Sequence, residues 1–338
     1  MEAGIIKMKI ALMSNNRFDF ERVYKDDVLS DIAKHGELST LITKENLIDN
    51  LDFLKDAEYI FTTWGMPVFS EAEIREYMPN LKGVFYAAGS VQYFAKPFLD
   101  NGIKVYSAFS ANAVPVAEYV FSLISLSTKG FFQASRMFKL QREASLNYGH
   151  SAPGNYKSKI GIVGLGAIGS LIAEKLKSLD VDVLAYDPFI PQEKADSLQV
   201  KLVNLETIFT QCDVISNHLA NKVELNDIFN DSLFSLMKQR ATFINTGRGA
   251  QVDEKALAKA LKEFPMRTAI IDVLKDEQNP RKSPLFWCDN VFMTPHLAGS
   301  SGNETQRMAR YMADEFERIL NNENPSYEVT SKMLKTMA

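Results

Sequence analysis

Cysteine, histidine and excess charge of one sign are all scarce in this chain. Its 338 residues include two cysteines, Cys212 and Cys288, whose spacing suggests neither a zinc site nor a disulfide framework. The net charge is -4, so no basic balance points to nucleic acid or an anionic membrane. The first residues carry an acid and lysines among apolar ones, unlike a signal peptide, and no apolar run approaches the roughly 20 residues that span a bilayer. We therefore expect a cytoplasmic protein without a metal, nucleic acid or membrane as partner.

What the chain has is an alternation of short apolar runs and helix-like stretches. The expected strands are 9–14, 39–43, 58–64, 82–88, 103–108, 159–164, 182–187, 200–203, 213–218, 241–246, 268–273 and 291–296. Near-continuous apolar strands that alternate with helices are typical of parallel sheets covered on both faces. The sequence thus predicts an α/β protein with two doubly wound parallel-sheet domains.

The longest helical patterns help to place the domain boundary. Helix-like spacing covers 20–34, 70–78, 114–130 and 303–321, whereas 131–157 is less regular. We interpret 131–157 as a connector into the second domain.

A glycine-rich turn begins the second half. In "KIGIVGLGAIGSLIAEKL" a strand pattern precedes Gly164-x-Gly166-x-x-Gly169 and a helix pattern follows it, which is the context that a dinucleotide-binding turn requires. The glycines permit a tight turn and a close approach to a pyrophosphate, and the helix N-terminus offers amide donors to the anion. Asp187 ends the next strand, 18 residues after Gly169 (187 − 169). Its carboxylate suits ribose hydroxyls and repels a 2′-phosphate, which favours NAD over NADP.

Three polar side chains follow other expected strands. In "FINTGRGAQVDE", Arg248 stands between two glycines just beyond an apolar run, where its fork of donors could hold a carboxylate. Asp272 ends the run in "AIIDVLKDE" with Glu277 just beyond, and His296 follows the run in "VFMTPHLAGS". Because the carboxyl ends of parallel strands line the ligand crevice, an arginine, a carboxylate and a histidine from three strand ends form a plausible site.

The chain has four histidines, so few residues compete with His296. His35 is explained by a helix C-terminus, and His150 falls in the connector. His218 also ends a strand and is the competing choice for the site.

These motifs resemble those of the D-isomer-specific 2-hydroxyacid dehydrogenases over roughly residues 80–320. The segments "NTGRGAQVDEKAL", "DVLKDEQ" and "TPHLAGS" are similar to the family's arginine, glutamate and histidine segments, in the same order. "ANAVPVAEYV" resembles the stretch where the family's chain enters the nucleotide domain. The resemblance implies a flavodoxin-like catalytic or substrate domain, residues 1–112 plus 300–338, and a Rossmann NAD-binding domain, residues 113–299. It also implies a homodimer held largely by elements near 113–150.

The resemblance also implies a chemistry, the interconversion of a small 2-oxo acid and a D-2-hydroxy acid. Arg248 would hold the substrate carboxylate and polarise the C2 carbonyl, while the glycines beside it let backbone and cofactor come close. His296 would act as general acid and base, and Glu277 would orient it and favour its charged form. Residues 87–90, "AAGS", would present backbone amides to the substrate, which makes Ala88, Gly89 and Ser90 substrate residues.

The cofactor residues are carried over in the same way. Asp272 would bind the nicotinamide carboxamide, and His218 and Thr246 would lie along the cofactor. The set expected to contact NAD is Gly164, Gly166, Ala167, Ile168, Gly169, Asp187, His218, Thr246, Asp272 and Gly299.

Two other functions stay open at this point. An NAD-sensing regulatory or corepressor-like protein could keep the same fold, although Arg248, Glu277 and His296 argue for retained chemistry. A dehydrogenase of formate or another small anion is the third reading, and a Glu rather than an amide at 277 weighs against formate. The chain departs from the family's pattern in "SVQYF" (90–94), "LANKVE" (219–224) and "DEQ" (276–278). Trp64 could line the pocket or lie in the core.

Overall fold

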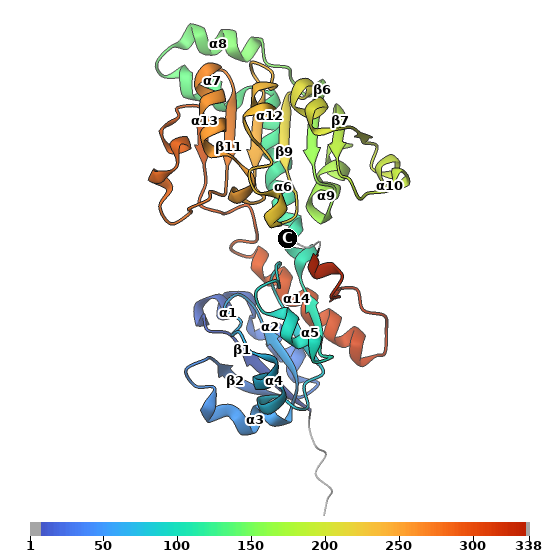
Figure 1. Cartoon of the computed structure of the whole chain (residues 1–338). Helices are drawn as coiled ribbons and strands as arrows, with labels where there is room; N and C mark the ends of the chain where they lie inside the picture. Colours follow the sequence, from blue (N-terminus) through green and yellow to red (C-terminus); the bar gives the residue numbers. More distant parts are fainter. Residues whose placement is uncertain (1–7, 336–338) are drawn as a thin grey trace, which may run out of the picture. The chain divides into compact units, whose positions relative to one another are not determined.

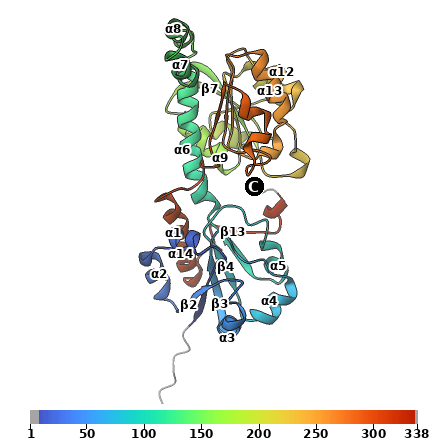
Figure 2. The same cartoon turned by 90° about the vertical axis from the view of Figure 1, so that its left-hand side faces the viewer.

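The structure, a computed structural model, describes residues 8–335, which form two compact units (Figures 1 and 2). Unit 1 contains the chain up to Asn112 together with the chain from Ser300 onward, and unit 2 contains Ala113–Gly299. The two units are described separately below.

Unit 1 is built around a six-stranded sheet with the order β13-β5-β4-β3-β1-β2. Its strands are β1 (Lys9–Met13), β2 (Glu37–Ile42), β3 (Ala57–Thr62), β4 (Gly83–Tyr86), β5 (Lys104–Ser107) and β13 (Glu328–Val329). All neighbours pair in parallel except β13, which pairs antiparallel with β5. The strand order β2-β1-β3-β4-β5 is that of the flavodoxin-like fold, as expected from the resemblance. The sequence did not predict the two-residue edge strand β13.

Helices cover both faces of this sheet (Figure 2). They are α1 (Arg17–Val23), α2 (Asp26–Ala33), α3 (Leu51–Asp56), α4 (Glu71–Tyr77), α5 (Ala95–Asp100) and α14 (Glu304–Leu320). Helix α14 packs against α1 and α2, whereas α4 packs against α3 and α5. The single helix expected over 20–34 is two helices, since the chain leaves the helical conformation at Tyr24 and Lys25.

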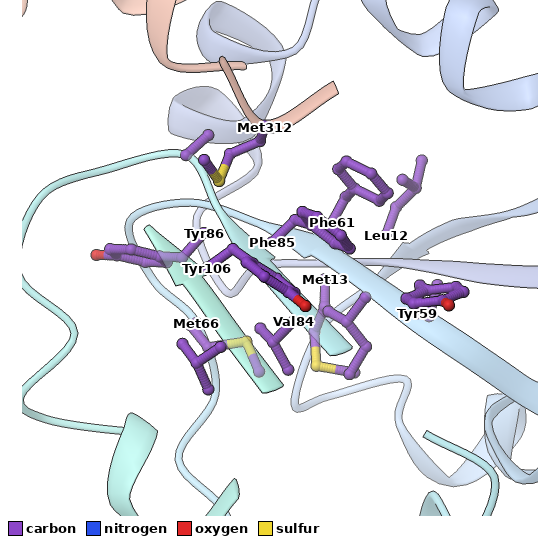
Figure 3. Close-up of a cluster of buried hydrophobic side chains, with 14 of the residues drawn as sticks. Leu12, Met13, Tyr59, Phe61, Met66, Val84, Phe85, Tyr86, Tyr106 and Met312 are labelled. Carbon is purple, nitrogen blue, oxygen red and sulfur yellow. The ribbon is translucent and has the colours of Figure 1, made fainter. Parts of the chain in front are cut away.

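Aromatic rings fill the core of unit 1 (Figure 3). Phe85 on β4 stacks on Phe61 of β3 and on Tyr106 of β5, with ring centroids 4.9 and 4.7 Å apart. Phe316 of α14 meets Phe85 edge-on at 5.3 Å, and all four side chains are almost fully buried. Three adjacent strands and one helix from the end of the chain therefore share one aromatic cluster.

Unit 2 has a seven-stranded sheet with the order β12-β11-β10-β9-β6-β7-β8, and every neighbouring pair is parallel. Its strands are β6 (Tyr156–Val163), β7 (Asp180–Tyr186), β8 (Lys201–Leu202), β9 (Val214–Asn217), β10 (Thr242–Asn245), β11 (Thr268–Ile271) and β12 (Val291–Met293). The strand order reverses between β6 and β9. In a doubly wound sheet this reversal lies beside the ligand crevice.

Two apolar clusters cover the faces of this sheet. One includes side chains from α6 (Phe109–Thr128), α9 (Ala167–Leu176) and α10 (Gln192–Ser197). The other includes side chains from α11 (Leu205–Gln211), α12 (Asp231–Ser235) and α13 (Glu254–Glu263). The predicted α/β fold class is confirmed, with β13 as the one antiparallel addition among the described strands.

The stretch 131–157, interpreted as a less regular connector into the second domain, lies inside unit 2 and is largely helical, so that interpretation was wrong. It contains α7 (Phe131–Phe138) and α8 (Arg142–His150), which pack on each other. Gly130, with φ +68°, separates α6 from α7. The two short helices and the loop between them leave the apolar side chains of Phe131, Phe138, Leu140 and Leu146 on the surface.

The expectation about long apolar segments also needs correction. Within residues 8–335 one helix, α6, is long and apolar enough to cross a membrane by length and composition, and 44% of that stretch is buried. Its side chains at Val116, Val120 and Ile124 pack into the core of unit 2. A helix that packs into a protein core needs apolar side chains, so its composition can match that of a membrane-spanning helix.

Candidate active site

The loop between β6 and α9 has glycine where a side chain would collide. Gly164 has φ +95°, and a Cβ there would lie 2.6 Å from the carbonyl oxygen of His218. A Cβ on Gly169 would lie 1.9 Å from the carbonyl oxygen of Gly164. A Cβ on Gly166, just before α9 begins at Ala167, meets nothing within 4 Å. The chain's own packing thus requires two of the glycines, while the backbone at Gly166 is open to a ligand that binds the helix N-terminus.

Asp187 joins the end of β7 to this loop. Its Oδ2 accepts a hydrogen bond from the amide of Leu165 at 2.8 Å, and its Oδ1 accepts one from the amide of Phe189 at 2.9 Å. Each carboxylate oxygen can accept a further hydrogen bond. The carboxylate therefore stays able to receive hydroxyl donors while it fixes the loop.

Arg248 lies three residues beyond the end of β10, and its guanidinium is partly buried. Its Nη1 donates to the carbonyl oxygen of Gly247 at 2.8 Å. Burial lowers the pKa of Arg248, and the negative charge of Glu277 acts in the opposite direction. The predicted arginine and glutamate are therefore close enough in the structure for their charges to interact.

The glycines beside Arg248 are explained by the protein's own packing. A Cβ on Gly249 would lie 2.0 Å from the carbonyl carbon of Leu274 and 2.5 Å from the amide nitrogen of Lys275. A Cβ on Gly247 would lie 2.9 Å from the side-chain nitrogen of Asn217. The loop that carries Arg248 thus packs directly on the backbone that leads to Glu277.

His296 follows β12 and contacts Glu277. The distance from His296 Nδ1 to Glu277 Oε2 is 3.0 Å, and both side chains are about half exposed, at 50% and 45%. His296 has φ +53°, a left-handed conformation that is costly for a residue with a Cβ and persists where the surroundings impose it. Because Glu277 occupies Nδ1, Nε2 is the ring nitrogen left for proton exchange with a substrate.

Asp272 imposes that conformation. Its backbone oxygen accepts from the amide of His296 at 2.9 Å. Its Oδ1 accepts from the hydroxyl of Thr294 at 2.6 Å and from the amide of Leu297 at 2.8 Å, and its Oδ2 accepts from the amide of Ala298 at 3.0 Å. Asp272 is 2% exposed, so this carboxylate is a buried clamp on the loop that carries His296.

The other predicted residues lie in several places. In unit 1, Ala88, Gly89 and Ser90 follow β4, and the hydroxyl of Ser107 donates to the carbonyl oxygens of Ala88 and Gly89 at 3.0 and 2.7 Å. Trp64, also in unit 1, packs partly buried against the core, with the guanidinium of Arg22 4.9 Å from its ring.

Comparison with known proteins identifies the family. Residues 121–298 match the family model for the D-isomer specific 2-hydroxyacid dehydrogenase, NAD binding domain. The chain is 32% identical over 313 residues to a glyoxylate reductase of Thermofilum pendens, which covers 90% of each chain. It belongs to the D-isomer specific 2-hydroxyacid dehydrogenase family.

Two further similarities set the scale of this relationship. The chain is 31% identical over 309 residues to a D-3-phosphoglycerate dehydrogenase of Methanocaldococcus jannaschii, covering 88% of this chain and 56% of that protein. It therefore spans about half the length of that relative. The fold also matches the crystal structure of a phosphoglycerate oxidoreductase from Rhizobium etli, with a TM-score of 0.80, 22% identity and coverage of 97% of this chain and 99% of that one. The matched residues, 121–298, lie within unit 2, which is therefore the NAD-binding domain of this family member.

Unit 2 of this family member has unpaired polar groups that suit a dinucleotide. The hydroxyl of Thr246, at the end of β10, and Nδ1 of His218, after β9, are buried without a hydrogen-bond partner. Buried polar groups are normally paired, so both fit a ligand that supplies the missing partner. The open backbone at Gly166 and the carboxylate of Asp187 fit the pyrophosphate and ribose of NAD.

His218 is not equivalent to His296. Its Nε2 lies 2.8 Å from the hydroxyl of Ser216, and burial lowers the pKa of His218 to about 3. The ring is therefore neutral near pH 7. His150 is exposed at the end of α8, and His35 meets Phe316 edge-on in unit 1, so neither belongs to this group.

Sequence reasoning missed a buried amide network under Arg248. Asn217 Nδ2 donates to Asn245 Oδ1 at 2.9 Å and to Gln251 Oε1 at 2.7 Å, and Asn245 Nδ2 donates to the carbonyl oxygen of Arg248 at 3.2 Å. Asn217 and Asn245 are cross-strand partners on β9 and β10. The sequence did contain a signal for this network, because an asparagine stands at the end of each of the two apolar runs.

Proposed function

We propose that this chain is an NAD-dependent oxidoreductase that interconverts a small 2-oxo acid and the D-2-hydroxy acid. The observation that carries the proposal is the 3.0 Å contact between His296 and Glu277. Arg248 lies on a neighbouring loop, which packs against the segment that leads to Glu277. An acid or base, a carboxylate that orients it and a fixed cation are the groups that this reaction needs.

Each residue has a role that follows from its chemistry. NAD supplies or accepts the hydride when it is bound. Arg248 binds the carboxylate of the substrate through its planar fork and draws electron density from the C2 oxygen. His296 gives a proton from Nε2 to that oxygen in reduction and takes it back in oxidation, while Glu277 stabilises the charged ring from Nδ1. The site has no need of His218 as an acid, since burial keeps it neutral.

The roles of the remaining predicted residues belong to the same proposal. Amides at Ala167 and Ile168 bind the pyrophosphate at the start of α9, and Gly299 lies beside the nicotinamide end. Asp272 binds the carboxamide through the one lone pair of Oδ2 that its three side-chain hydrogen bonds leave over. Ala88, Gly89 and Ser90 of unit 1 bind substrate.

A turnover assay tests the proposal. The purified protein is mixed with NADH and a panel of 2-oxo acids that includes glyoxylate and pyruvate, and the loss of NADH absorbance is measured. We expect turnover of at least one acid, with the D-hydroxy acid rather than the L-form oxidised in reverse. His296→Ala should lose most of the rate in both directions and still bind NADH, while His150→Ala at the exposed end of α8 serves as the control. NADH binding without turnover of any 2-oxo acid would favour a regulatory role instead.

We also propose that the protein is a cytoplasmic homodimer formed by unit 2. Apolar side chains on α6, α7, α8 and the loop between α7 and α8 are exposed in the single chain, namely Leu126, Phe131, Phe138, Leu140 and Leu146. Apolar groups gathered on one segment are typical of a protein interface. Light scattering should give twice the mass of the 38.0 kDa chain, and Leu140→Glu, where the side chain is 87% exposed, should give the monomer.

A further inference from the structure

Glu277 is carried on a loop that is anchored two residues earlier, at Lys275. The amide nitrogen of Lys275 donates to Oε1 of Glu254 at 2.9 Å. Glu254 is the first residue of α13, and its side chain is partly buried. The ammonium group of Lys275 forms an ion pair with Asp227. One carboxylate therefore holds the backbone of this residue and another holds its side chain.

The same backbone is pressed against the loop of Arg248. Gly249 leaves no space for a Cβ beside Leu274 and Lys275, so the two loops touch directly there. Glu254 lies six residues after Arg248 (254 − 248) and at the start of the helix that follows it. Its bond to Lys275 is thus a second link between the segment of Arg248 and the segment of Glu277.

The contact between Glu277 and His296 depends on these links. Both side chains are about half exposed, so neighbouring side chains hold them only in part, and the position of the backbone at 274–277 contributes to whether Oε2 reaches Nδ1. A displacement of about 1 Å in a catalytic group can cost about 100-fold in rate. A residue that fixes this backbone therefore acts on the reaction without touching the substrate.

We propose that Glu254 is a positioning residue of the active site, which holds the amide of Lys275 so that Glu277 stays in contact with His296. The proposal rests on the proposed function, because it assigns Glu254 a role in that same site. It differs from a helix-stabilising role, in which an acid in the first turn of α13 would favour the helix dipole through its charge alone.

Four variants separate these roles. Glu254→Ala removes the acceptor and the charge, whereas Glu254→Gln removes the charge and keeps an acceptor oxygen for the amide. Glu206→Ala is the matched control, since Glu206 is an exposed acid in the first turn of α11. Lys275→Met removes the ion pair with Asp227 and keeps the amide.

The kinetic outcome should follow the acceptor. We expect Glu254→Ala to lower kcat for reduction by about 10- to 100-fold near neutral pH, with NADH affinity unchanged. Glu254→Gln and Lys275→Met should each stay within about threefold of the parent, and Glu206→Ala should match it. If Glu254→Ala behaves like Glu206→Ala, or Glu254→Gln loses as much as Glu254→Ala, the positioning role is wrong.

A second readout does not depend on turnover. In NMR spectra of the NADH-bound protein, the Nδ1–H proton of His296 should show a strong hydrogen bond in the parent and in Glu254→Gln, and lose it in Glu254→Ala as it does in Glu277→Ala. If no 2-oxo acid is turned over but this pattern appears, the proposed function fails and the positioning role stands. If turnover is normal but the His296 signal is unchanged in Glu254→Ala, the positioning role fails alone.

Discussion

The two units share an architecture but differ in what lies at the ends of their strands. In unit 1 the buried polar residues there are neutral hydroxyls, such as Ser14, Thr63 and Ser107, and each donates to a nearby carbonyl oxygen. In unit 2 the strand ends carry a carboxylate at Asp272 and an unpaired hydroxyl at Thr246. Both doubly wound units have a row of strand ends at which a site could form, and the residue types at those ends decide whether a reaction can take place.

The core of unit 1 provides the largest expected effect. Phe85→Ala removes a fully buried ring that stacks on two others, and should lower the free energy of unfolding by about 3–5 kcal/mol. Denaturant unfolding measures this loss, and Phe18→Ala, at a side chain that is 74% exposed, should stay within about 0.5 kcal/mol. At temperatures where the variant is folded, its affinity for NADH should be that of the parent. If the folded variant bound NADH more weakly than the parent, NADH binding would not be a property of unit 2 alone.

Arg248 tests the chemistry of unit 2. Lysine keeps the charge but has no planar fork, so Arg248→Lys should lower kcat/KM for 2-oxo acids on the order of 100-fold. The affinity for NADH should change little, because the phosphates bind elsewhere. Steady-state kinetics and fluorescence titration measure the two quantities. Near-normal turnover would remove the anchoring role from Arg248.

Asp187 tests the cofactor preference of the same unit. Its carboxylate opposes a 2′-phosphate, so kcat/KM should be higher with NADH than with NADPH. Asp187→Ala should narrow the difference by roughly 1–3 kcal/mol. Because Asp187 also holds Leu165 and Phe189, Asp187→Asn is the better control for lost structure. A clear preference of the parent protein for NADPH would contradict this prediction.

The pH profile distinguishes the two strand-end histidines. Reduction needs a proton on His296, so its rate should fall as pH rises, while oxidation should rise over the same range. Glu277→Gln keeps an acceptor for Nδ1 but removes the negative charge beside the ring, so reduction at neutral pH should fall about tenfold. His218→Gln should leave the profiles in place, since burial keeps the pKa of His218 near 3. The reverse result would exchange the roles of the two histidines.

The last expected effect is on the free energy of unfolding and appears only in acid. Burial lowers the pKa of His218 from 6.5 to about 3, so the unfolded chain binds this proton more readily between those values. Stability from the neutral ring is therefore complete above about pH 6.5 and is lost as pH falls toward 3. As pH falls below about 6.5, the free energy of unfolding of the parent should decrease by roughly 1 kcal/mol more per pH unit than that of His218→Asn. Equal slopes in denaturant titrations at several pH values would show that the ring is solvated.

The sequence predicted what depends on local pattern. Apolar runs located the strands within a few residues, and the glycine turn located the junction of β6 and α9. It did not reveal β13, since a two-residue strand exists only through its pairing with β5. Nor did it reveal the helices over 131–150, whose apolar residues Phe131 and Phe138 lie exposed rather than in a core.

The sequence predicted the residues of the candidate site but not the hydrogen bonds that hold their loops in place. Residue types and order pointed to Arg248, Glu277 and His296. The bonds from Asp272 to the loop of His296, and from Glu254 to Lys275, depend on which strand ends are neighbours, which only the folded sheet decides.

The packing of Gly249 has a consequence for mutational tolerance. A side chain there would push against the backbone of Leu274 and Lys275, so one substitution would disturb the segments of both Arg248 and Glu277. A saturation library scored for growth on the reaction product should therefore accept almost nothing but glycine at 249. At Gly102, where a Cβ would meet nothing within 4 Å, asparagine and aspartate should be accepted despite φ +78°. The demand for glycine at 249 would then come from the packing of two loops rather than from the reaction itself.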